Sequence, residues 1–153
     1  MDARPATASA TLATRAAFRL ELWLRARLLP LRLAGHDTLA GMLALAEPAA
    51  GRRHFAGLPA AYVVRAVRRT LRHRVVMRGR PCLREGLLAY RFLAEAGYRP
   101  QLHFGVDPGI VASDRAVAHC WVTLDGATVI GGSQIPYVEI HVHPGGIGSA
   151  PRG

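Results

Sequence analysis

The spacing of hydrophobic residues differs between the two halves of the chain. Up to about residue 97, apolar residues recur every three or four positions with arginines between them, which is typical of amphipathic helices. Prolines and glycines follow these stretches and indicate where the helices end. Pro30, for example, is expected to end the first helix. The pattern predicts four helices, at residues 11–29, 38–47, 59–73 and 81–97.

Beyond residue 99 the period changes to two, because apolar and polar residues alternate. Such alternation indicates β-strands. The dipeptide Asp125-Gly126 is a strong signal for a tight hairpin turn, so the segments on either side of it are expected to pair. The expected strands are residues 101–106, 118–124, 127–132 and 137–143. Since helices come first and an antiparallel sheet follows, we predict the α+β class.

The length of 153 residues is typical of a single domain with one hydrophobic core. The helical and strand patterns divide this domain into regions. The expected parts of the domain 1–153 are an N-terminal helical region (1–55), a core (56–143) with the helix 81–97 and the sheet 100–143, and a disordered Pro/Gly-rich tail (144–153).

Charge adds a preference for acidic partners. The chain has 20 basic and 10 acidic residues, a net charge of +10, and such an excess attracts anionic molecules. No aromatic-and-basic strand motif is visible, so nucleic acid is not an expected partner. The third helix carries arginines at positions 65, 68, 69, 72 and 74. They form either a solvated face or a surface that docks an acidic peptide, in which Arg65 and Arg69 would be central.

Several classes of protein are excluded by simple counts. The apolar segments are shorter than the ~18 to 20 residues of a membrane span, so no membrane span is expected. The N-terminus lacks the apolar run of a secretory signal. Two cysteines cannot build a disulfide framework or a zinc ribbon. We therefore predict a reduced, cytoplasmic location.

The helix 81–97 has an unusual distribution of side chains. At about 100° per residue, Arg84, Arg91 and Glu95 fall on one narrow polar stripe. The opposite side carries small and apolar residues together with the first cysteine, namely Cys82, Gly86, Ala89 and Leu93. A helix that is apolar over most of its circumference lies in the middle of a fold. We therefore expect this helix to be buried, with Cys82 facing a flat partner such as the sheet.

The position of Cys82 behind Pro81, at the start of a helix, has a chemical consequence. The positive end of the helix dipole lowers the pKa of a cysteine, and unpaired N–H groups there can bind an oxyanion. His119, at the start of the strand 118–124, could activate such a thiol. The alternatives are that Cys82 is a small buried hydrophobe and that His119 is an ordinary strand histidine.

These two segments resemble a known family. "CLREGLLAYRFLAEAGYRPQLHFGV" and "HCWVTLDGATV" are similar to the microcin-processing, transglutaminase-like cysteine peptidases of bacterial lasso-peptide gene clusters. The shared features, in chain order, are Cys82-Leu83, Gly97, Gly105-Val106, His119, Trp121-Val122 and Asp125-Gly126. The resemblance implies a transglutaminase-like, papain-like fold, with Cys82 as the nucleophile and His119 as the base.

The same resemblance implies a function and partners. Such an enzyme removes the leader segment from a ribosomally made precursor peptide and needs no cofactor. The expected partners are the precursor peptide, a separate small leader-recognition protein and an ATP-dependent macrolactam cyclase.

The third member of the family's triad is missing. The resemblance places an aspartate about twelve residues after the histidine, where this chain has Gly131. A two-residue turn at Asp125-Gly126 would put His119 opposite Gly132, and a three-residue turn would put it opposite Ser133. Either Gln134 or Ser133 is then expected to orient the imidazole weakly, or the site has lost activity. In the second case the protein is a non-catalytic scaffold that binds the precursor or a maturation partner.

The remaining candidates have simpler interpretations. Cys120 neighbours His119 but points to the other face of its strand, so we expect it in the core. His141 and His143 share a strand face with Glu139 and, with His103, could bind a metal. Because the spacing fixes no further ligand, we predict no metal site and interpret these residues as solvated strand histidines.

Overall fold

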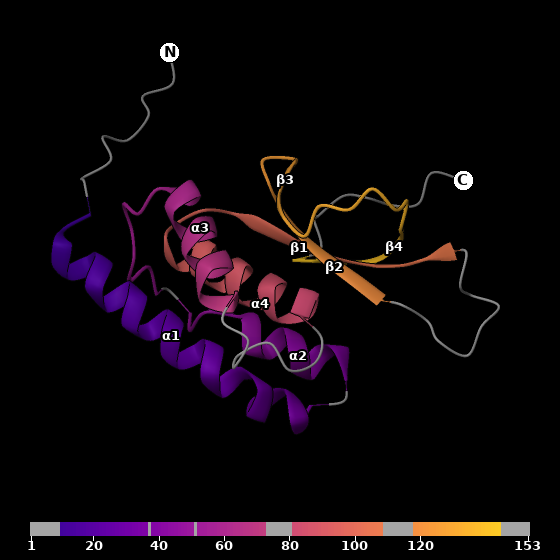
Figure 1. The fold of residues 1–153 in the computed structure, drawn as a ribbon, viewed down its shortest axis with the longest axis horizontal. Helices are drawn as coiled ribbons and strands as arrows, with labels where there is room; N and C mark the ends of the chain where they lie inside the picture. Colours follow the sequence, from indigo (N-terminus) through magenta and orange to yellow (C-terminus); the bar gives the residue numbers. More distant parts are fainter. Residues whose placement is uncertain (1–9, 37, 51, 73–80, 109–117, 145–153) are drawn as a thin grey trace, which may run out of the picture.

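The fold is seen in a computed structural model that describes residues 10–36, 38–50, 52–72, 81–108 and 118–144. Four helices, α1 (Leu12–Ala34), α2 (Leu39–Ala46), α3 (Ala60–Leu71) and α4 (Pro81–Glu95), precede four strands, β1 (Pro100–Val106), β2 (Ala118–Leu124), β3 (Ala127–Ile130) and β4 (Val138–His143) (Figure 1). This order confirms the α+β class. Arg74 and residues 145–153 of the expected tail lie outside the described residues.

The strands form one antiparallel sheet in the order β3-β2-β1-β4. Asp125 and Gly126 join β2 to β3 with φ of 50° and 80°, the left-handed values that a two-residue hairpin turn requires. The pairing of β2 with β3 shifts between Val122 and Thr123. As a result Val122 lies opposite Ile130, one residue beyond the regular register expected from the turn.

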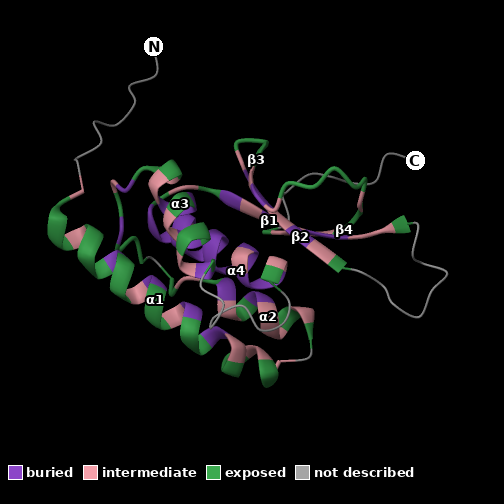
Figure 2. Cartoon of the chain, in the orientation of Figure 1, coloured by how far each residue is buried: buried purple, intermediate pink, exposed green. Residues whose placement is uncertain are grey.

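Helix α4 lies in the middle of the molecule, as its sequence predicted. Eleven of its fifteen residues are buried, and Figure 2 shows it as an almost continuously buried helix. One side packs on β1 and β2, while α1, α2 and α3 contact it from other directions. The polar stripe is also buried, with Arg84 at 2% and Glu95 at 1% exposure. Both the stripe and the apolar side of α4 are therefore covered by protein.

A glycine sets the distance between α4 and the sheet. A Cβ atom added to Gly86 would stand 2.9 Å from Cys120 Sγ on β2 and 3.0 Å from Leu102 Cδ1 on β1. Both distances are shorter than ordinary van der Waals contact. The absence of a side chain at Gly86 thus lets α4 lie close to the two central strands.

The first helix is longer than predicted. Pro30 lies inside α1, which continues to Ala34, although proline removes one helical hydrogen bond and crowds the preceding turn. The helix is held on both sides of Pro30, because Leu29 is buried and Leu33 packs against the core. Packing therefore outweighs the local preference of proline to end the helix.

Aromatic rings join the N-terminal helices to α4. Phe18 of α1 makes edge-to-face contacts with Phe55 and Phe92, with ring centroids 5.4 and 5.3 Å apart. All three rings are at most 3% exposed. Edge-to-face pairs contribute beyond their buried area, so this cluster helps to hold α1 against α4. None of the helices in the described part of the chain has the length and apolar character that crossing a membrane requires.

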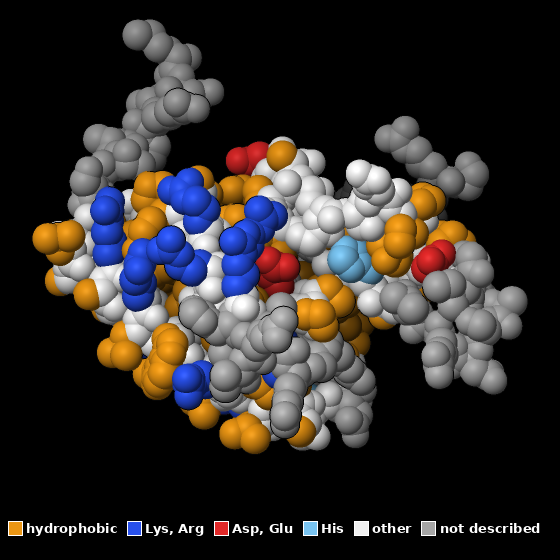
Figure 3. Space-filling model, in the orientation of Figure 1, with side chains coloured by type: hydrophobic (Ala, Val, Ile, Leu, Met, Phe, Trp, Pro, Cys, Tyr) orange, Lys and Arg blue, Asp and Glu red, His pale blue; other side chains and the backbone are white. Residues whose placement is uncertain are grey.

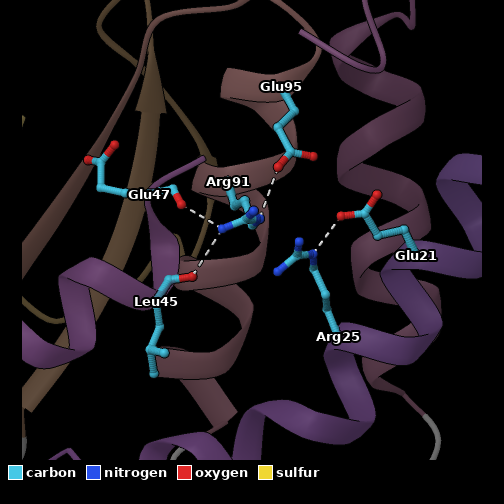
Figure 4. Close-up of polar contacts among 6 residues, drawn as sticks. All are labelled: Glu21, Arg25, Leu45, Glu47, Arg91 and Glu95. Atoms are coloured by element: carbon cyan, nitrogen blue, oxygen red, sulfur yellow. Dashed lines mark hydrogen bonds and ion pairs between the residues drawn. The ribbon is translucent and has the colours of Figure 1, made fainter. Parts of the chain in front are cut away.

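A buried ion pair lies where α1, α2 and α4 meet (Figure 4). Arg91 Nε is 3.0 Å from Glu95 Oε1, and Arg91 Nη1 donates hydrogen bonds to the carbonyl oxygens of Glu47 and Leu45 near the end of α2. Burial lowers the pKa of Arg91 and raises the pKa of Glu95. Desolvation therefore opposes both charges, and each one depends on the other.

We expect Arg91→Met to lower the free energy of unfolding by about 3 to 5 kcal/mol, because it leaves the Glu95 carboxylate buried without its partner. The double variant Arg91→Met, Glu95→Leu should recover most of this loss. The control is Arg25→Met, which breaks the more exposed Arg25–Glu21 pair and should cost less than about 1 kcal/mol. Urea denaturation measures all three, and equal losses for Arg91→Met and Arg25→Met would contradict the expectation.

Candidate active site

Cys82 lies at the N-terminus of α4, one residue after Pro81 begins the helix. Its side chain is partly exposed. The first N–H groups of a helix have no partner inside the helix, so those that follow Pro81 are directed toward the region around Cys82. Cys82 thus lies, partly exposed, at the positive end of a helix that is otherwise mostly buried.

The sheet brings His119 to this cysteine. His119 is in β2, opposite Gly105 of β1, and β2 packs against α4. The side chain of His119 lies close enough to that of Cys82 to lower the pKa of the thiol through hydrogen bonding and through its charge. The two residues that the sequence singled out therefore lie close enough to interact.

The surroundings lower the pKa of Cys82 to about 5. The largest cause is a hydrogen bond with the Cys120 side chain, and the hydrogen bond and charge of His119 act in the same direction, whereas burial opposes them. A thiol with this pKa is almost entirely a thiolate at pH 7. The thiolate is the nucleophilic form of cysteine, so Cys82 has the chemistry of an activated nucleophile.

Cys120 has the opposite character. It is 2% exposed, as expected for the inner face of β2, and its thiol lies 2.9 Å from the carbonyl oxygen of Cys82, to which it donates. The hydrogen bond with Cys82 and burial raise the pKa of Cys120. Cys120 therefore remains a neutral thiol, whose single S–H proton is directed at Cys82. The sequence assigned it to the core and did not predict this contact.

His119 is oriented by a main-chain group. Its Nε2 donates a hydrogen bond to the carbonyl oxygen of Gly131, at 2.7 Å. Because Nε2 carries this proton, Nδ1 is the ring atom left to exchange a proton with Cys82. The carbonyl of Gly131 occupies the role that a carboxylate or amide side chain has in other cysteine-histidine sites.

Gly131 cannot carry the aspartate that the family pattern places there. Its φ is +74°, and an added Cβ would stand 2.5 Å from the carbonyl oxygen of Cys120. The orienting contact also differs from the one expected at Gln134. Strand β3 ends at Ile130 after its register shift, so the segment that follows leaves the sheet. Gln134 is exposed, and Nε2 of His119 is hydrogen-bonded to the carbonyl oxygen of Gly131 instead.

Stacked rings hold the plane of the imidazole. Tyr137 stacks on His119 with centroids 4.7 Å apart, and Trp121 lies 6.1 Å away on a nearly parallel plane. Trp121 in turn stacks on His103 at 5.3 Å. The same-face position of His119 and Trp121 follows from strand alternation. Tyr137 comes from an irregular segment before β4, and no sequence signal predicted its contact.

A pocket of about 410 Å³ opens beside this stack. It is lined by His119, Trp121, Thr128, Gly131, Gly132, Ser133, Ile135 and Tyr137. Ser133, the second residue considered for orienting His119, lies on this pocket wall. Its Oγ accepts a hydrogen bond from the Ile135 N–H. The pocket is large enough for a few side chains of a peptide next to the histidine.

One carboxylate lies close to the pair. Glu85 follows Cys82 by one helical turn, and its Oε1 is 3.8 Å from Arg68 Nε on α3. Burial raises the pKa of Glu85, and the charge of Arg68 opposes this shift. Glu85 also interacts electrostatically with Cys82 and His119. The sequence did not point to this residue, although its position one turn after Cys82 could have.

The histidines considered for metal binding have other partners. His103 Nδ1 is 2.6 Å from Glu139 Oε2, and its Nε2 is 2.8 Å from Thr123 Oγ1. His143 is hydrogen-bonded to Glu47, while His141 lies against the ring of Phe104. Within the described ranges, no three His, Cys, Asp or Glu side chains are grouped so that they could hold a metal ion.

Comparison with known proteins assigns the chain to a family. The model of the transglutaminase-like superfamily matches residues 22–141, which include both candidate residues, strands β1 to β3, most of β4 and the second half of α1. The chain therefore belongs to the transglutaminase-like superfamily. This superfamily includes cysteine peptidases. Comparison with curated proteins and with solved structures found no significant match.

The low pKa of Cys82 predicts its reactivity. The rate at which iodoacetamide alkylates Cys82 should rise with pH, with a midpoint near pH 5, and should be constant at pH 7. For an ordinary thiol the midpoint of this curve lies at about pH 8.5. Cys120→Ala should move the midpoint to higher pH, because it removes the largest stabilising contact. Cys82→Ala should leave the protein unlabelled, since Cys120 is buried. Mass spectrometry across a pH series measures this, and a wild-type midpoint near 8.5 would contradict it.

Gly131 and Gly132 offer a matched test of the orienting carbonyl. Gly131→Ala should lower the free energy of unfolding by about 1 to 3 kcal/mol, because the left-handed backbone is strained for alanine and the Cβ meets Cys120. It should also raise the alkylation midpoint of Cys82, since His119 loses its position. At Gly132 the nearest atom to an added Cβ is Thr128 Cγ2, at 3.9 Å, so Gly132→Ala should change neither. Equal effects of the two variants would contradict the assignment.

Proposed function

We propose that this protein is a cysteine peptidase that removes the leader segment from a ribosomally made, lasso-type precursor peptide. The observation that carries the proposal is the position of Cys82 at the start of α4, close to His119, where the pKa of Cys82 is lowered to about 5. Membership of the transglutaminase-like superfamily supports the reaction class. The resemblance of the motifs around both residues to the peptidases of lasso-peptide clusters supports the substrate.

In the first half of the reaction, the Cys82 thiolate attacks the carbonyl carbon of the scissile peptide bond and forms a tetrahedral intermediate. The N–H groups at the start of α4 can stabilise the negative oxygen of this intermediate. His119 then gives the proton on Nδ1 to the departing amine while the C–N bond breaks. The acyl group stays on Cys82 as a thioester, and the amine product leaves.

In the second half, His119 acts as a base. Its Nδ1 takes a proton from a water molecule as the water attacks the thioester carbonyl. The C–S bond breaks, the Cys82 thiolate is regenerated and the acid product leaves. The hydrogen bond to Gly131 keeps the proton on Nε2 throughout, so Nδ1 alone exchanges protons with the reacting atoms.

The proposed enzyme acts with partners in the cytoplasm. A separate small protein would recognise the leader, and an ATP-dependent macrolactam cyclase would use the released core peptide. Both partners follow from the resemblance to lasso-peptide peptidases. No cofactor is required, because every step above uses only thiol, imidazole, N–H and water.

A non-catalytic scaffold that binds the precursor is the second candidate. The observation in its favour is that His119 is paired with a neutral carbonyl, which stabilises a positive imidazole less than a carboxylate does. The low pKa of Cys82 favours the peptidase instead, because binding alone needs no thiolate.

Cys82→Ala should reduce cleavage of a lasso-type precursor by at least about 10³-fold, because no other group can form the thioester. Cleavage is measured by mass spectrometry of the released leader, with the recognition protein supplied. Cys120→Ala is the matched control, since it also removes a thiol but leaves the nucleophile in place; it should retain cleavage, with the activity shifted to higher pH because the pKa of Cys82 rises.

Two outcomes would contradict the peptidase. Full cleavage by Cys82→Ala would show that Cys82 is not the nucleophile. A wild-type protein that binds the precursor without cleaving it, together with a normal circular dichroism spectrum, would support the scaffold.

A further inference from the structure

A groove lined by arginines runs along α1 and α3. It has a volume of about 380 Å³, and we call it the arginine groove, defined by Arg19, Tyr62, Arg65, Arg68, Arg69 and Arg72. Figure 3 shows blue side chains gathered over these two helices. The groove extends the basic helix of the sequence analysis, because α1 contributes Arg19 to it.

The positive charge of this groove is mostly uncompensated. Glu85, which is 3.8 Å from Arg68, is the one carboxylate that forms an ion pair with these arginines among the described residues. Like charges so close together repel one another. A bound anion would relieve this repulsion, so the groove is built for a negatively charged ligand.

The inner end of the groove adjoins the candidate active site. Arg68 Nη2 donates a hydrogen bond to the carbonyl oxygen of Val129 on β3, at 3.1 Å, and Arg68 also pairs with Glu85. Val129 is two residues before Gly131, which holds His119, and Glu85 is one helical turn after Cys82. A chain that lies in the groove would therefore be led toward the reactive pair.

The aromatic ring in the groove argues against nucleic acid. Single-stranded nucleic acids bind by stacking bases on free aromatic rings. Tyr62 is already in contact with the guanidinium groups of Arg15 and Arg19, at 5.5 and 5.9 Å, and with the ring of Phe18. Its hydroxyl accepts a hydrogen bond from Arg19 Nε. The groove therefore offers guanidinium groups and no free stacking surface.

We propose that the arginine groove binds an acidic segment of the peptide substrate and directs the adjoining scissile bond to Cys82. Planar guanidinium groups suit carboxylates because they can donate two parallel hydrogen bonds to one of them. The proposal rests on the peptidase function for the identity of the ligand. Arg68 is the junction between the groove and the site, and Arg65 and Arg69 bind the acidic segment.

Binding can be measured separately from cleavage. The protein is the Cys82→Ala variant, and the probes are two fluorescein-labelled peptides that differ only in a run of six glutamates or six glutamines. At low salt the glutamate peptide should bind at least about tenfold more tightly. Its affinity should fall as salt rises, because the Debye length shrinks from about 10 Å at 0.1 M to about 3 Å at 1 M.

Charge reversal locates the binding surface. Arg65→Glu together with Arg69→Glu should weaken binding of the glutamate peptide by at least about tenfold, and Arg65→Gln with Arg69→Gln should weaken it less. The control is Arg52→Glu with Arg53→Glu, which makes the same change of charge at exposed positions outside the groove and should have a much smaller effect. All these residues are exposed, and thermal unfolding verifies that each variant is folded.

Equal binding by the groove variant and the control variant would overturn the proposal. So would a single-stranded oligonucleotide of equal charge that binds more tightly than the glutamate peptide. If the glutamate peptide binds as expected but the wild-type protein does not cleave the precursor, the groove proposal stands and the peptidase proposal is wrong. With an active enzyme, the groove variant should raise KM about tenfold and leave kcat nearly unchanged, since it removes binding rather than chemistry.

Discussion

The close approach of α4 to β2 at Gly86 is the constraint on which the candidate site depends. A side chain at this position would meet Cys120 Sγ and Leu102 and would push the helix away from the sheet. The same approach brings Cys82 within reach of both Cys120 and His119. Packing of one small residue therefore controls the chemistry of a residue one turn away, because the helix transmits the displacement as a rigid body.

Main-chain geometry replaces a side chain in the orientation of His119. The left-handed φ of Gly131 turns the chain at the end of β3, so that a carbonyl oxygen points at Nε2. A neutral acceptor fixes the tautomer but adds less charge stabilisation than a carboxylate. The rings of Tyr137 and Trp121 supply the remaining restraint on the imidazole. The carbonyl of Gly131 thus stabilises the charge of His119 only weakly, whereas this hydrogen bond and the two stacked rings fix the position of the imidazole.

The sequence predicted the parts of this architecture that follow from regular periods. The buried helix α4, the inward face of Cys82 and Cys120, and the hairpin at Asp125-Gly126 all follow from helical or strand repeats and one turn signal. Departures from regular structure were not predictable. The extension of α1 through Pro30 depends on packing, and the register shift in β2-β3 moved the contact of His119 to Gly131. Neither is encoded in a local pattern.

Two kinds of arginine account for the electrostatics of the molecule. Arg91 is buried where three helices meet and is paired with Glu95. Replacing it would leave the Glu95 carboxylate buried without a partner. The arginines of the groove are exposed and repel one another, so they contribute little to stability. Because these exposed arginines repel one another and hold no packed elements together, they are available to bind a ligand. Arg68 shares features of both kinds, since it is exposed like the other groove arginines but also donates a hydrogen bond from α3 to the Val129 carbonyl on β3 and pairs with Glu85 of α4.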